Sequence, residues 1–341
     1  MAKTVRLKDI AEKIGVSTVT VSKALSGQKG MSDELREKIH ALANEMGYIP
    51  SISRKVDIFS KSYTIGLLIS EDNMTEYSSY YTKMHQKVSQ IAMEMGCFTM
   101  LEVVSEQSEK KKNFPRIVAD KKVDGIIVIG RLSGEYLRSI RDNFSIPMIY
   151  LDFCNHTGDE DAVVADSFHG AYLLTNHLFD MGHTSIAFVG TIMAEGNITD
   201  RYLGYVKSLL EHSHPVRKDW VIPDRDLSTG EMDYNRFFKL PEEMPSAFFC
   251  NCDVSASMLI KRLNEKGYKV PDDISVAGYD NYIFPGLCDI KLTTFEVDTY
   301  EMGRNAIYSL IRKIGGERYR QGVMILEGHM VLGDSVKNLN A

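Results

Sequence analysis

The sequence predicts a small all-α head followed by a larger α/β part with two doubly wound parallel sheets. Three observations predict this fold class. Apolar residues recur at helical spacing through residues 7–46. From residue 64 onward, short apolar runs alternate with amphipathic stretches, which is typical of buried parallel strands separated by helices. Between these parts, residues 51–63 are polar and have no core pattern, so they read as a linker.

The composition is that of a globular protein with two or three domains. The chain has 341 residues, of which 44% are hydrophobic and 25% charged. No apolar run approaches the length that a membrane-spanning helix needs. The first ten residues, MAKTVRLKDI, carry charges without the apolar stretch of a secretion signal. We therefore expect a cytoplasmic protein.

The cysteines favour neither a disulfide framework nor a metal site. Their number is odd, and they are scattered through apolar segments as Cys97, Cys154, Cys250, Cys252 and Cys288. Cys250 and Cys252 form a C-x-C pair, but no second Cys or His cluster accompanies it. We expect buried thiols, no bound metal and no cofactor.

Charge is distributed unevenly along the chain. Residues 1–60 hold ten basic and seven acidic side chains, a net charge of +3. Because the whole chain carries −6, the remaining 281 residues carry −9. A basic head on an acidic body suits a module that contacts phosphates while the body stays away from them.

The first two predicted helices form a helix-turn-helix pattern. The first spans residues 7–14, Gly15 provides a positive φ, and Ser17 is a good N-cap for the second helix. On that second helix, one face is apolar with Val21, Ala24 and Leu25. The other face is small, polar and basic, with Val19, Ser22, Lys23 and Ser26. Such a helix either enters the DNA major groove or belongs to an ordinary surface hairpin.

A third helix completes the head, and the linker follows it. Ser32 is its predicted N-cap, and Gly47 with Tyr48-Ile49-Pro50 ends it. Its inner face is formed by Leu35, Ile39, Leu42, Ala43 and Met46.

The α/β part reads as two series of strands and helices with a boundary near residues 158–163. The first series has strands at 64–70, 97–104, 125–130 and 147–152, and helices at 81–95, 109–120 and 134–143. The second has strands at 162–166, 185–190, 247–251 and 275–280, and helices at 168–181, 198–212, 234–238 and 254–266. A strand at 292–297, a helix at 299–314 and strands around 324–332 close the chain. Ligands of such folds bind at the carboxyl ends of the strands, here in the cleft between two lobes.

Catalytic signatures are absent from the sequence. It contains no phosphate-binding loop, dinucleotide-binding glycine motif, nucleophile elbow or H-E-x-x-H zinc motif. Asp152 and Asp280 each end a strand, which suits either catalysis or binding, but nothing pairs them with a nucleophile or base. We expect the protein not to be an enzyme.

The chain resembles the LacI/GalR family of bacterial transcription regulators over nearly its whole length. The resemblance lies in the ordered segments LKDIAEKIGVSTVTVSKAL, EMGYIP, TIGLLI, KKVDGIIVIG, IPMIYLD, HLFDMGHTSIAFVG, RYLGYVKSL, KGYKVPDDISVAGYDN and LTTFEVDTYEMGRNAI. It implies a DNA-binding head at 1–50, a hinge at 51–63 and a two-lobed core at 64–336 that resembles periplasmic sugar-binding proteins. Lobe one would comprise about 64–160 and 295–322, and lobe two about 161–294 and 323–336.

The resemblance also implies which head residues contact DNA. The family's base-reading positions fall on Thr18, Val19 and Lys23, where lysine can donate to guanine and the methyl groups can touch thymine. The alternative for Thr18 and Val19 is packing at the helix start. Its phosphate-binding positions fall on Ser17, Thr20, Ser22 and Ser26.

The hinge departs from the family pattern. Relatives carry an Ala-Arg-x-Leu run whose leucine wedges into the minor groove. Here Asp57 stands at the leucine position, and a carboxylate is a poor wedge beside phosphates. Either Val56 or Ile58 substitutes with a one-residue shift, beside Arg54 and Lys55, or the hinge binds without a strong kink.

The family's effector-binding positions combine aromatic, acidic and basic side chains suited to a sugar. They fall on Tyr80, Tyr81, Asp152, Phe153, Asn197, Arg201, Phe249, Asp253 and Asp280. Helix capping or turn formation is the alternative for Asp253 and Asp280, and core packing is the alternative for the two phenylalanines. Cys252 replaces an asparagine common in sugar-binding relatives, which alters the usual hexose contacts. Glu195 stands where purine-binding relatives have a basic residue, which disfavours a purine.

We therefore predict a ligand-responsive transcriptional repressor. It would bind a pseudo-palindromic operator as a homodimer, and a sugar or sugar-derived effector between the lobes would tune that binding. The alternative is a sugar-binding protein with a vestigial head.

Overall fold

The computed structural model describes residues 7–25, 32–46, 62–74, 79–154, 161–227, 230–282, 288–317 and 322–340. The chain divides into two compact units, Met1–Asp57 and Ile58–Ala341. Each unit is described by itself.

The first unit contains three helices around a small apolar core. They are α1 (Leu7–Ile14), α2 (Thr18–Leu25) and α3 (Asp33–Glu45), and these ranges confirm the predicted head helices. The core consists of Ile10, Ala11, Val21, Ala24, Ile39 and Ala43. The predicted capping is also confirmed: the backbone amide of Thr20 donates to Ser17 Oγ, that of Leu35 donates to Ser32 Oγ, and Gly15 has a φ of 78°.

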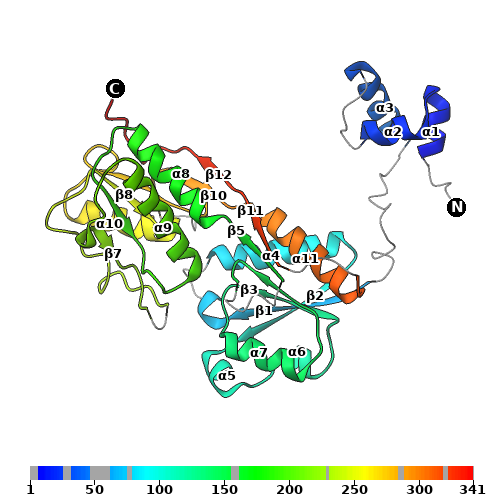
Figure 1. Cartoon of the computed structure of the whole chain (residues 1–341), viewed down its shortest axis with the longest axis horizontal. Helices are drawn as coiled ribbons and strands as arrows, with labels where there is room; N and C mark the ends of the chain where they lie inside the picture. The colour runs from blue at the N-terminus through cyan, green and yellow to red at the C-terminus, as the bar shows by residue number, and fades with distance from the viewer. Residues whose placement is uncertain are drawn as a thin grey trace. The chain divides into compact units, whose positions relative to one another are not determined.

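The second unit begins with a six-stranded parallel sheet, lobe one. The strand order is β11-β5-β4-β3-β1-β2, and the strands are β1 (Thr64–Ser70), β2 (Phe98–Val104), β3 (Gly125–Ile129), β4 (Met148–Leu151), β5 (Asp161–Ala165) and β11 (Val323–Leu326). Figure 1 shows α4 (Ser79–Glu94) and α11 (Thr299–Ile314) on one face. The helices α5 (Glu106–Lys111), α6 (Arg116–Ala119) and α7 (Gly134–Asn143) cover the other face. A short 3-10 helix, η2 (Glu71–Met74), follows β1.

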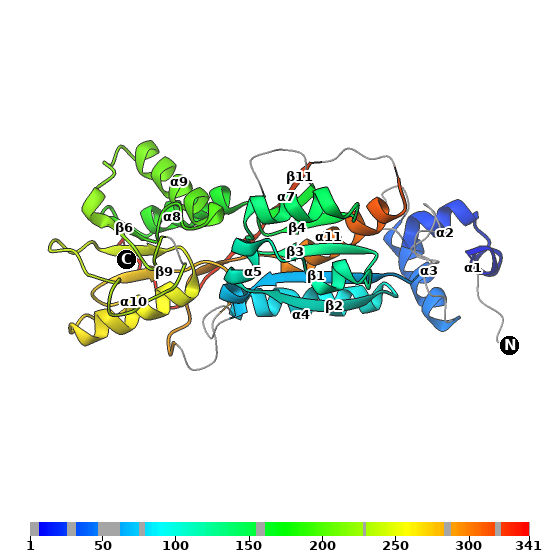
Figure 2. The same ribbon diagram turned by 90° about the horizontal axis from the view of Figure 1, so that it is seen from below.

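Lobe two is built on a four-stranded parallel sheet in the order β7-β6-β8-β9. Its strands are β6 (Ile186–Val189), β7 (Val221–Ile222), β8 (Ala247–Cys250) and β9 (Ser275–Ala277). Helices α8 (Ser167–Asp180) and α9 (Gly196–Glu211) cover one face, and α10 (Asp253–Glu265) covers the other (Figure 2). A 3-10 helix, η3 (Lys218–Trp220), precedes β7. The strands β10 (Thr294–Glu296) and β12 (His329–Val331) form an antiparallel ribbon.

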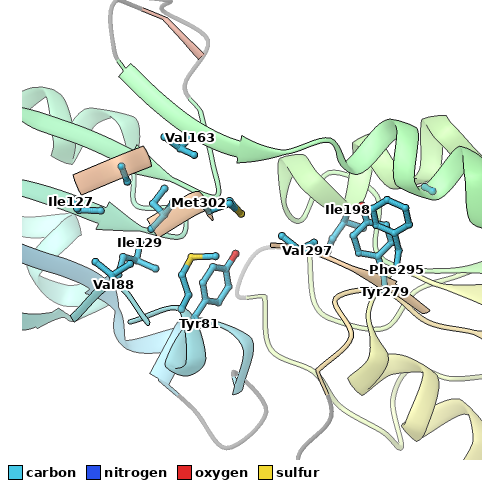
Figure 3. Close-up of a cluster of buried hydrophobic side chains, with 14 of the residues drawn as sticks. Tyr81, Val88, Ile127, Ile129, Val163, Ile198, Tyr279, Phe295, Val297 and Met302 are labelled. Carbon is cyan, nitrogen blue, oxygen red and sulfur yellow. The ribbon is translucent and has the colours of Figure 1, made fainter. Parts of the chain in front are cut away.

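The described chain passes between the lobes three times. The connections lie between β5 and α8, between β10 and α11, and between β11 and β12. Figure 3 shows Val297, on the second connection, between the apolar side chains of lobe one and those of lobe two. One continuous cluster of buried residues reaches both lobes. The lobes therefore share packing at the connections.

Three predicted segments belong to the other lobe. Residues 161–165 and 323–326 were expected in lobe two, but they form β5 and β11 at the edge of lobe one's sheet. The reason is pairing: β5 runs parallel to β4, and β11 runs parallel to β5. The first crossing to lobe two therefore comes after β5. Strand β10, whose residues 295 and 296 were expected in lobe one, pairs with β12 in lobe two's ribbon.

Two predicted helices are wrong. The expected helix at 109–120 is two short helices, α5 and α6, because Pro115 cannot lie inside a helix and starts the second one. The expected helix at 234–238 is a turn. The Asp233 carboxylate accepts hydrogen bonds from the amides of Asn235 and Arg236, which competes with helix formation. The remaining predicted helices match α4, α7, α8, α9, α10 and α11 within three residues at either end.

Helices α8 and α9 approach closely at Gly204. A Cβ atom there would lie 2.2 Å from the backbone oxygen of Phe168 and 2.9 Å from the backbone nitrogen of Tyr172. We expect Gly204→Ala to lower the free energy of unfolding by about 1–3 kcal/mol, since backbone must move. Urea denaturation measures this. Gly196→Ala on the same helix is the control, because its Cβ would meet no atom within 4 Å; equal losses in both variants would contradict the prediction.

Candidate functional site

The outer face of α2 is exposed in the first unit. Val19 is 62% exposed, although it is a large apolar residue. Ser17, Thr18, Ser22 and Lys23 are exposed beside it, and Thr20 is half-buried. Ser17 and Thr20 also hydrogen-bond each other through their hydroxyl groups at 2.9 Å. The helix therefore presents a small, mostly polar surface with one basic side chain, Lys23, as the spacing predicted. The remaining predicted DNA-contacting residues, Ser26, Arg54, Lys55, Val56 and Ile58, and with them Asp57, lie outside the described residues.

A cleft of about 1270 Å³ lies between the lobes of the second unit. Lobe one lines it from the start of α4, from the segments after β1 and β3, and from the region of α5. Lobe two lines it from the loop after β6, the first turns of α9 and α10, and the segment after β9. The parallel strands thus direct their carboxyl ends at this cleft, which is where such folds bind ligands.

Five predicted effector-binding residues line this cleft together. They are Tyr80, Tyr81, Asn197, Arg201 and Asp280. Burial raises the pKa of both tyrosines well above their ordinary value, so their hydroxyl groups stay neutral. The two rings meet edge to face, with centroids 5.3 Å apart. The tyrosines supply apolar surface and two hydroxyl groups on the side of lobe one.

Arg201 is the central cation of the cleft. Its Nη2 lies 3.0 Å from Asp280 Oδ1, and its Nη1 donates to the backbone oxygen of Asn251 at 2.5 Å. The guanidinium also lies over the ring of Tyr279, 3.8 Å from its centroid. Burial opposes the charge, but Asp280 and its neighbours raise the pKa of Arg201 above its ordinary value. The group is therefore a fixed, oriented donor.

Asp152 is not one of the residues that line the cleft, but it lies next to Tyr80, which does. It is 6% exposed, and the Tyr80 hydroxyl donates to its Oδ1 at 3.5 Å. Burial raises the pKa of Asp152 to about 7, against the lowering effect of Arg201, and Asp280 and Glu195 raise it further. Asp152 and Asp280 have φ angles of 68° and 95°, a strained conformation for residues other than glycine. Strain at both acids is consistent with a binding site.

Like Asp152, three further predicted residues do not line the cleft. Phe249 is fully buried on β8 and packs edge to face on Phe188, so it belongs to the core of lobe two. Phe153 stacks on Tyr150 at 4.6 Å and packs against the cluster on the far side of lobe one's sheet. Core packing, the alternative for both phenylalanines, therefore describes them.

Asp253 also has a structural role, because its carboxylate bonds other parts of lobe two. It begins α10, and it accepts hydrogen bonds from Thr294 Oγ1 at 2.7 Å and from the backbone amide of Tyr282 at 2.8 Å. Burial raises its pKa to about 8. These bonds tie the segment after β9 to the ribbon strand β10. Asp253 thus holds the backbone near Asp280 and does not itself face the cleft.

Sequence reasoning missed a charged group in lobe two. Arg225 lines the cleft, bonds Asp224 through two hydrogen bonds of 3.1 and 2.8 Å, and lies 3.5 Å from Glu195 Oε1. Burial opposes ionisation of Asp224, but Arg225, Ser255 and Asn251 lower its pKa to about 2. Asp224 and Arg225 are adjacent in the sequence and follow β7 (Val221–Ile222), a strand of only two residues. A strand this short has no periodic pattern in the sequence, so nothing there could have identified the pair.

Glu195 reaches across the cleft. The Tyr81 hydroxyl of lobe one donates to Glu195 Oε2 at 3.4 Å, and Arg131 Nη1 donates to the backbone oxygen of neighbouring Ala194 at 3.2 Å. Both bonds join lobe one to the loop after β6. This loop is therefore a site of hydrogen bonding between the two lobes.

Cys252 is a capping residue at the cleft. Its Sγ accepts from the backbone amide of Ser255 at 3.4 Å, at the start of α10. Burial raises its pKa to about 11, so the group is a neutral thiol. The described residues hold no cluster of three or more His, Cys, Asp or Glu side chains suited to a metal ion. None of the described helices is both long and apolar enough to cross a membrane.

Two family models match the chain. Residues 6–51 match the model of bacterial regulatory proteins of the lacI family, and residues 175–336 match a periplasmic binding protein-like domain. The HTH-type transcriptional repressor PurR of Vibrio campbellii is 29% identical over 98% of this chain and 99% of its own length. The PurR of Actinobacillus pleuropneumoniae serotype 3 is also 29% identical, with the same coverage.

Solved structures show the same fold. The transcriptional regulator CelR in complex with cellobiose superposes with a TM-score of 0.69 at 23% identity, covering 97% of this chain and 99% of that one. The lac repressor dimer bound to operator and the anti-inducer ONPF gives a TM-score of 0.67 at 23% identity, covering 98% and 100%.

Proposed function

The chain belongs to the LacI/GalR family of bacterial transcriptional regulators and is a ligand-responsive transcriptional repressor, and we propose the following details of its action. It binds a pseudo-palindromic operator as a homodimer. A sugar or sugar-derived effector in the interlobe cleft changes its affinity for that DNA. The cleft carries this proposal, because it brings Arg201, Asp280 and two tyrosines together.

The exposed face of α2 supports operator reading. Thr18, Val19 and Lys23 are all exposed, so each can reach a base edge when the helix lies in the major groove. Ser17, Thr20 and Ser22 contact phosphates in this proposal. Two heads of a dimer then read half-sites about one helical turn apart.

The edge of lobe one's sheet supports a dimer. Strand β2 is an edge strand, and Phe98 on it is 68% exposed. Met93, Met100, Leu101 and Val103 are exposed beside it. An exposed apolar edge is a hazard for a monomer and a ready surface for a two-fold partner. We propose that a second copy of the chain covers it.

The polar groups of the cleft support a sugar. Arg201 and Asp280 offer a donor and an acceptor for neighbouring hydroxyl groups, and the tyrosine rings offer apolar surface for the C–H side of a pyranose. The ligand changes DNA binding only through its different affinities for two arrangements of the lobes. The bonds of Tyr81 and Arg131 to the loop after β6 are contacts that such a change makes or breaks.

The domain scheme and location follow from this role. We propose a head at 1–50, a hinge at 51–63 and a core from 64 to 336, with β5 and β11 in lobe one. Operator DNA lies in the bacterial cytoplasm, and we place the protein there. A repressor needs no catalytic step, so we propose that it has none.

Gel shifts with the DNA upstream of its own gene test the proposal. We expect a specific shift that weakens as salt rises, since phosphate contacts release counterions. A thermal-shift screen of sugars should then find a ligand, and that ligand should change the operator affinity. A protein that binds sugars but gives no specific shift would support the alternative of a vestigial head.

A further inference from the structure

We propose that the effector carries a protonated amino group, as a hexosamine does, and that Asp152 and Glu195 receive it. This inference rests on the proposed function, because it concerns the ligand of the same cleft.

Carboxylates outnumber basic side chains in a group of largely buried charges at the cleft. Glu195, Asp280, Arg201 and Arg225 line the cleft, whereas Asp152 and Asp224 lie behind it, bonded to the lining residues Tyr80 and Arg225. We call these six side chains the floor of the cleft, and if all six ionise, they carry an excess of two negative charges. A buried excess of one sign is costly unless a partner of opposite sign arrives.

The guanidinium groups of Arg201 and Arg225 already have carboxylate partners. Arg201 forms its ion pair with Asp280, and Arg225 forms a two-bond pair with Asp224. Arg225 approaches Glu195 only at 3.5 Å. At the rim, Lys110 pairs with Glu106, and Lys112 pairs with Glu135. Asp152 has no ion pair within 4.0 Å among the described residues.

Unsatisfied acceptors point to a ligand rich in donors. Asp152 Oδ2 is buried and accepts no hydrogen bond in the described part of the chain, and the same holds for Asn197 Oδ1. The hydrogen bond that Tyr80 donates to Asp152 Oδ1 is long at 3.5 Å. Buried acceptors of this kind normally have partners. An ammonium group supplies three donors and the missing positive charge at once.

Other ligand classes fit less well. The described acids are not grouped so that three of them could hold a metal ion. A uronate or sugar phosphate would bring a further negative charge to a floor that already has an excess. A neutral hexose satisfies the acceptors with hydroxyl groups but supplies no positive charge that would favour the ionised form of Asp152.

Matched sugars test the proposal with the full-length chain. Glucose, glucosamine, N-acetylglucosamine and glucuronate, and the corresponding galactose series, are titrated at pH 7.0 by calorimetry. We expect the amino sugar of one series to bind at least about tenfold more tightly than its neutral parent, and the uronate to bind weakest. N-acetylation removes the charge and should remove the advantage.

Two variants tie the preference to its residues. Asp152→Asn should reduce the advantage of the amino sugar over the neutral parent to about twofold or less, because the remaining amide carries no charge. Glu195→Gln should also reduce the advantage of the amino sugar. This second variant keeps the test possible if Asp152→Asn does not fold. Asp142→Asn, which removes an exposed charge from the same lobe, should leave the advantage unchanged.

The outcomes separate this inference from the proposed function. If a neutral sugar or a uronate binds best and changes operator affinity, the repressor assignment stands and the amino-group inference is overturned. An amino-sugar preference that survives in both Asp152→Asn and Glu195→Gln overturns it as well. If an amino sugar binds as expected but no ligand changes operator affinity, the amino-group inference stands and the proposed regulatory role of the cleft is overturned.

Discussion

Replacing Arg201 by alanine is expected to abolish the effector response and to lower the free energy of unfolding by about 3–5 kcal/mol. The side chain is 3% exposed and forms an ion pair with Asp280 at 3.0 Å. Its loss leaves that carboxylate buried without its cation and removes the donor to the backbone of Asn251. Urea denaturation measures the stability, and gel shifts with and without the sugar found by thermal shift measure the response.

Two companion variants separate charge from geometry. Arg201→Lys keeps the charge but cannot make the bonds to Asp280 and Asn251 together, so it should retain part of the stability and little of the response. Arg236→Ala removes an arginine whose side chain is 64% exposed and should cost about 1 kcal/mol or less. A fully responsive Arg201→Ala protein would remove this residue from the effector site.

The head was predictable because its signals are local. Ser17 and Ser32 cap the helices that follow them, and Gly15 takes the positive φ that ends the first helix. Each of these features depends on residues within one turn, and periodicity alone placed Val21 and Ala24 in the core. Local chemistry and tertiary packing agree here, so the helix boundaries followed from the sequence.

The presence of two α/β lobes was predictable from the sequence, but the lobe to which each strand belongs was not. Both AVVAD and the run around Met324 were recognised as strands, and strand propensity does not say which sheet a strand joins. That choice depends on pairing with β4 and β5, which are distant in sequence from β11. A count of alternating strands and helices therefore predicted two lobes and assigned β5, β11 and part of β10 to the wrong lobe.

The cleft was predictable where a residue ends a strand or starts a helix. Tyr80 lies at the start of α4, Asp280 follows β9, and Arg201 lies one turn after the start of α9; the family pattern marked all three. The prediction for Phe249 was wrong because side chains alternate between the two faces along β8. The side chain of Phe249 lies on the face that packs into the core between the sheet and its covering helices. Arg225 was missed because its role depends on Glu195, which another loop brings within 3.5 Å.

Replacing Lys23 by alanine is expected to lower operator affinity by about 5- to 150-fold and to relax the preference at one base pair of each half-site. Lys23 lies on the exposed face of α2 with Val19 and Ser22. Its ammonium group can donate to guanine O6 and N7, and alanine cannot replace those bonds. Gel-shift titrations with an operator series that carries single base-pair substitutions measure both effects.

Lys13→Ala provides the comparison that decides between base reading and simple charge. Lys13 is exposed in the last turn of α1, so its loss removes the same charge from the same unit without touching the proposed reading face. If Lys23 reads a base, its loss should reduce discrimination at one position, whereas the loss of Lys13 should weaken all operators equally. If Lys23→Ala also weakens every operator equally and lowers the salt dependence by about one counterion, Lys23 contacts a phosphate. Sequence reading would then fall to Thr18 and Val19, whose methyl groups can select only for thymine.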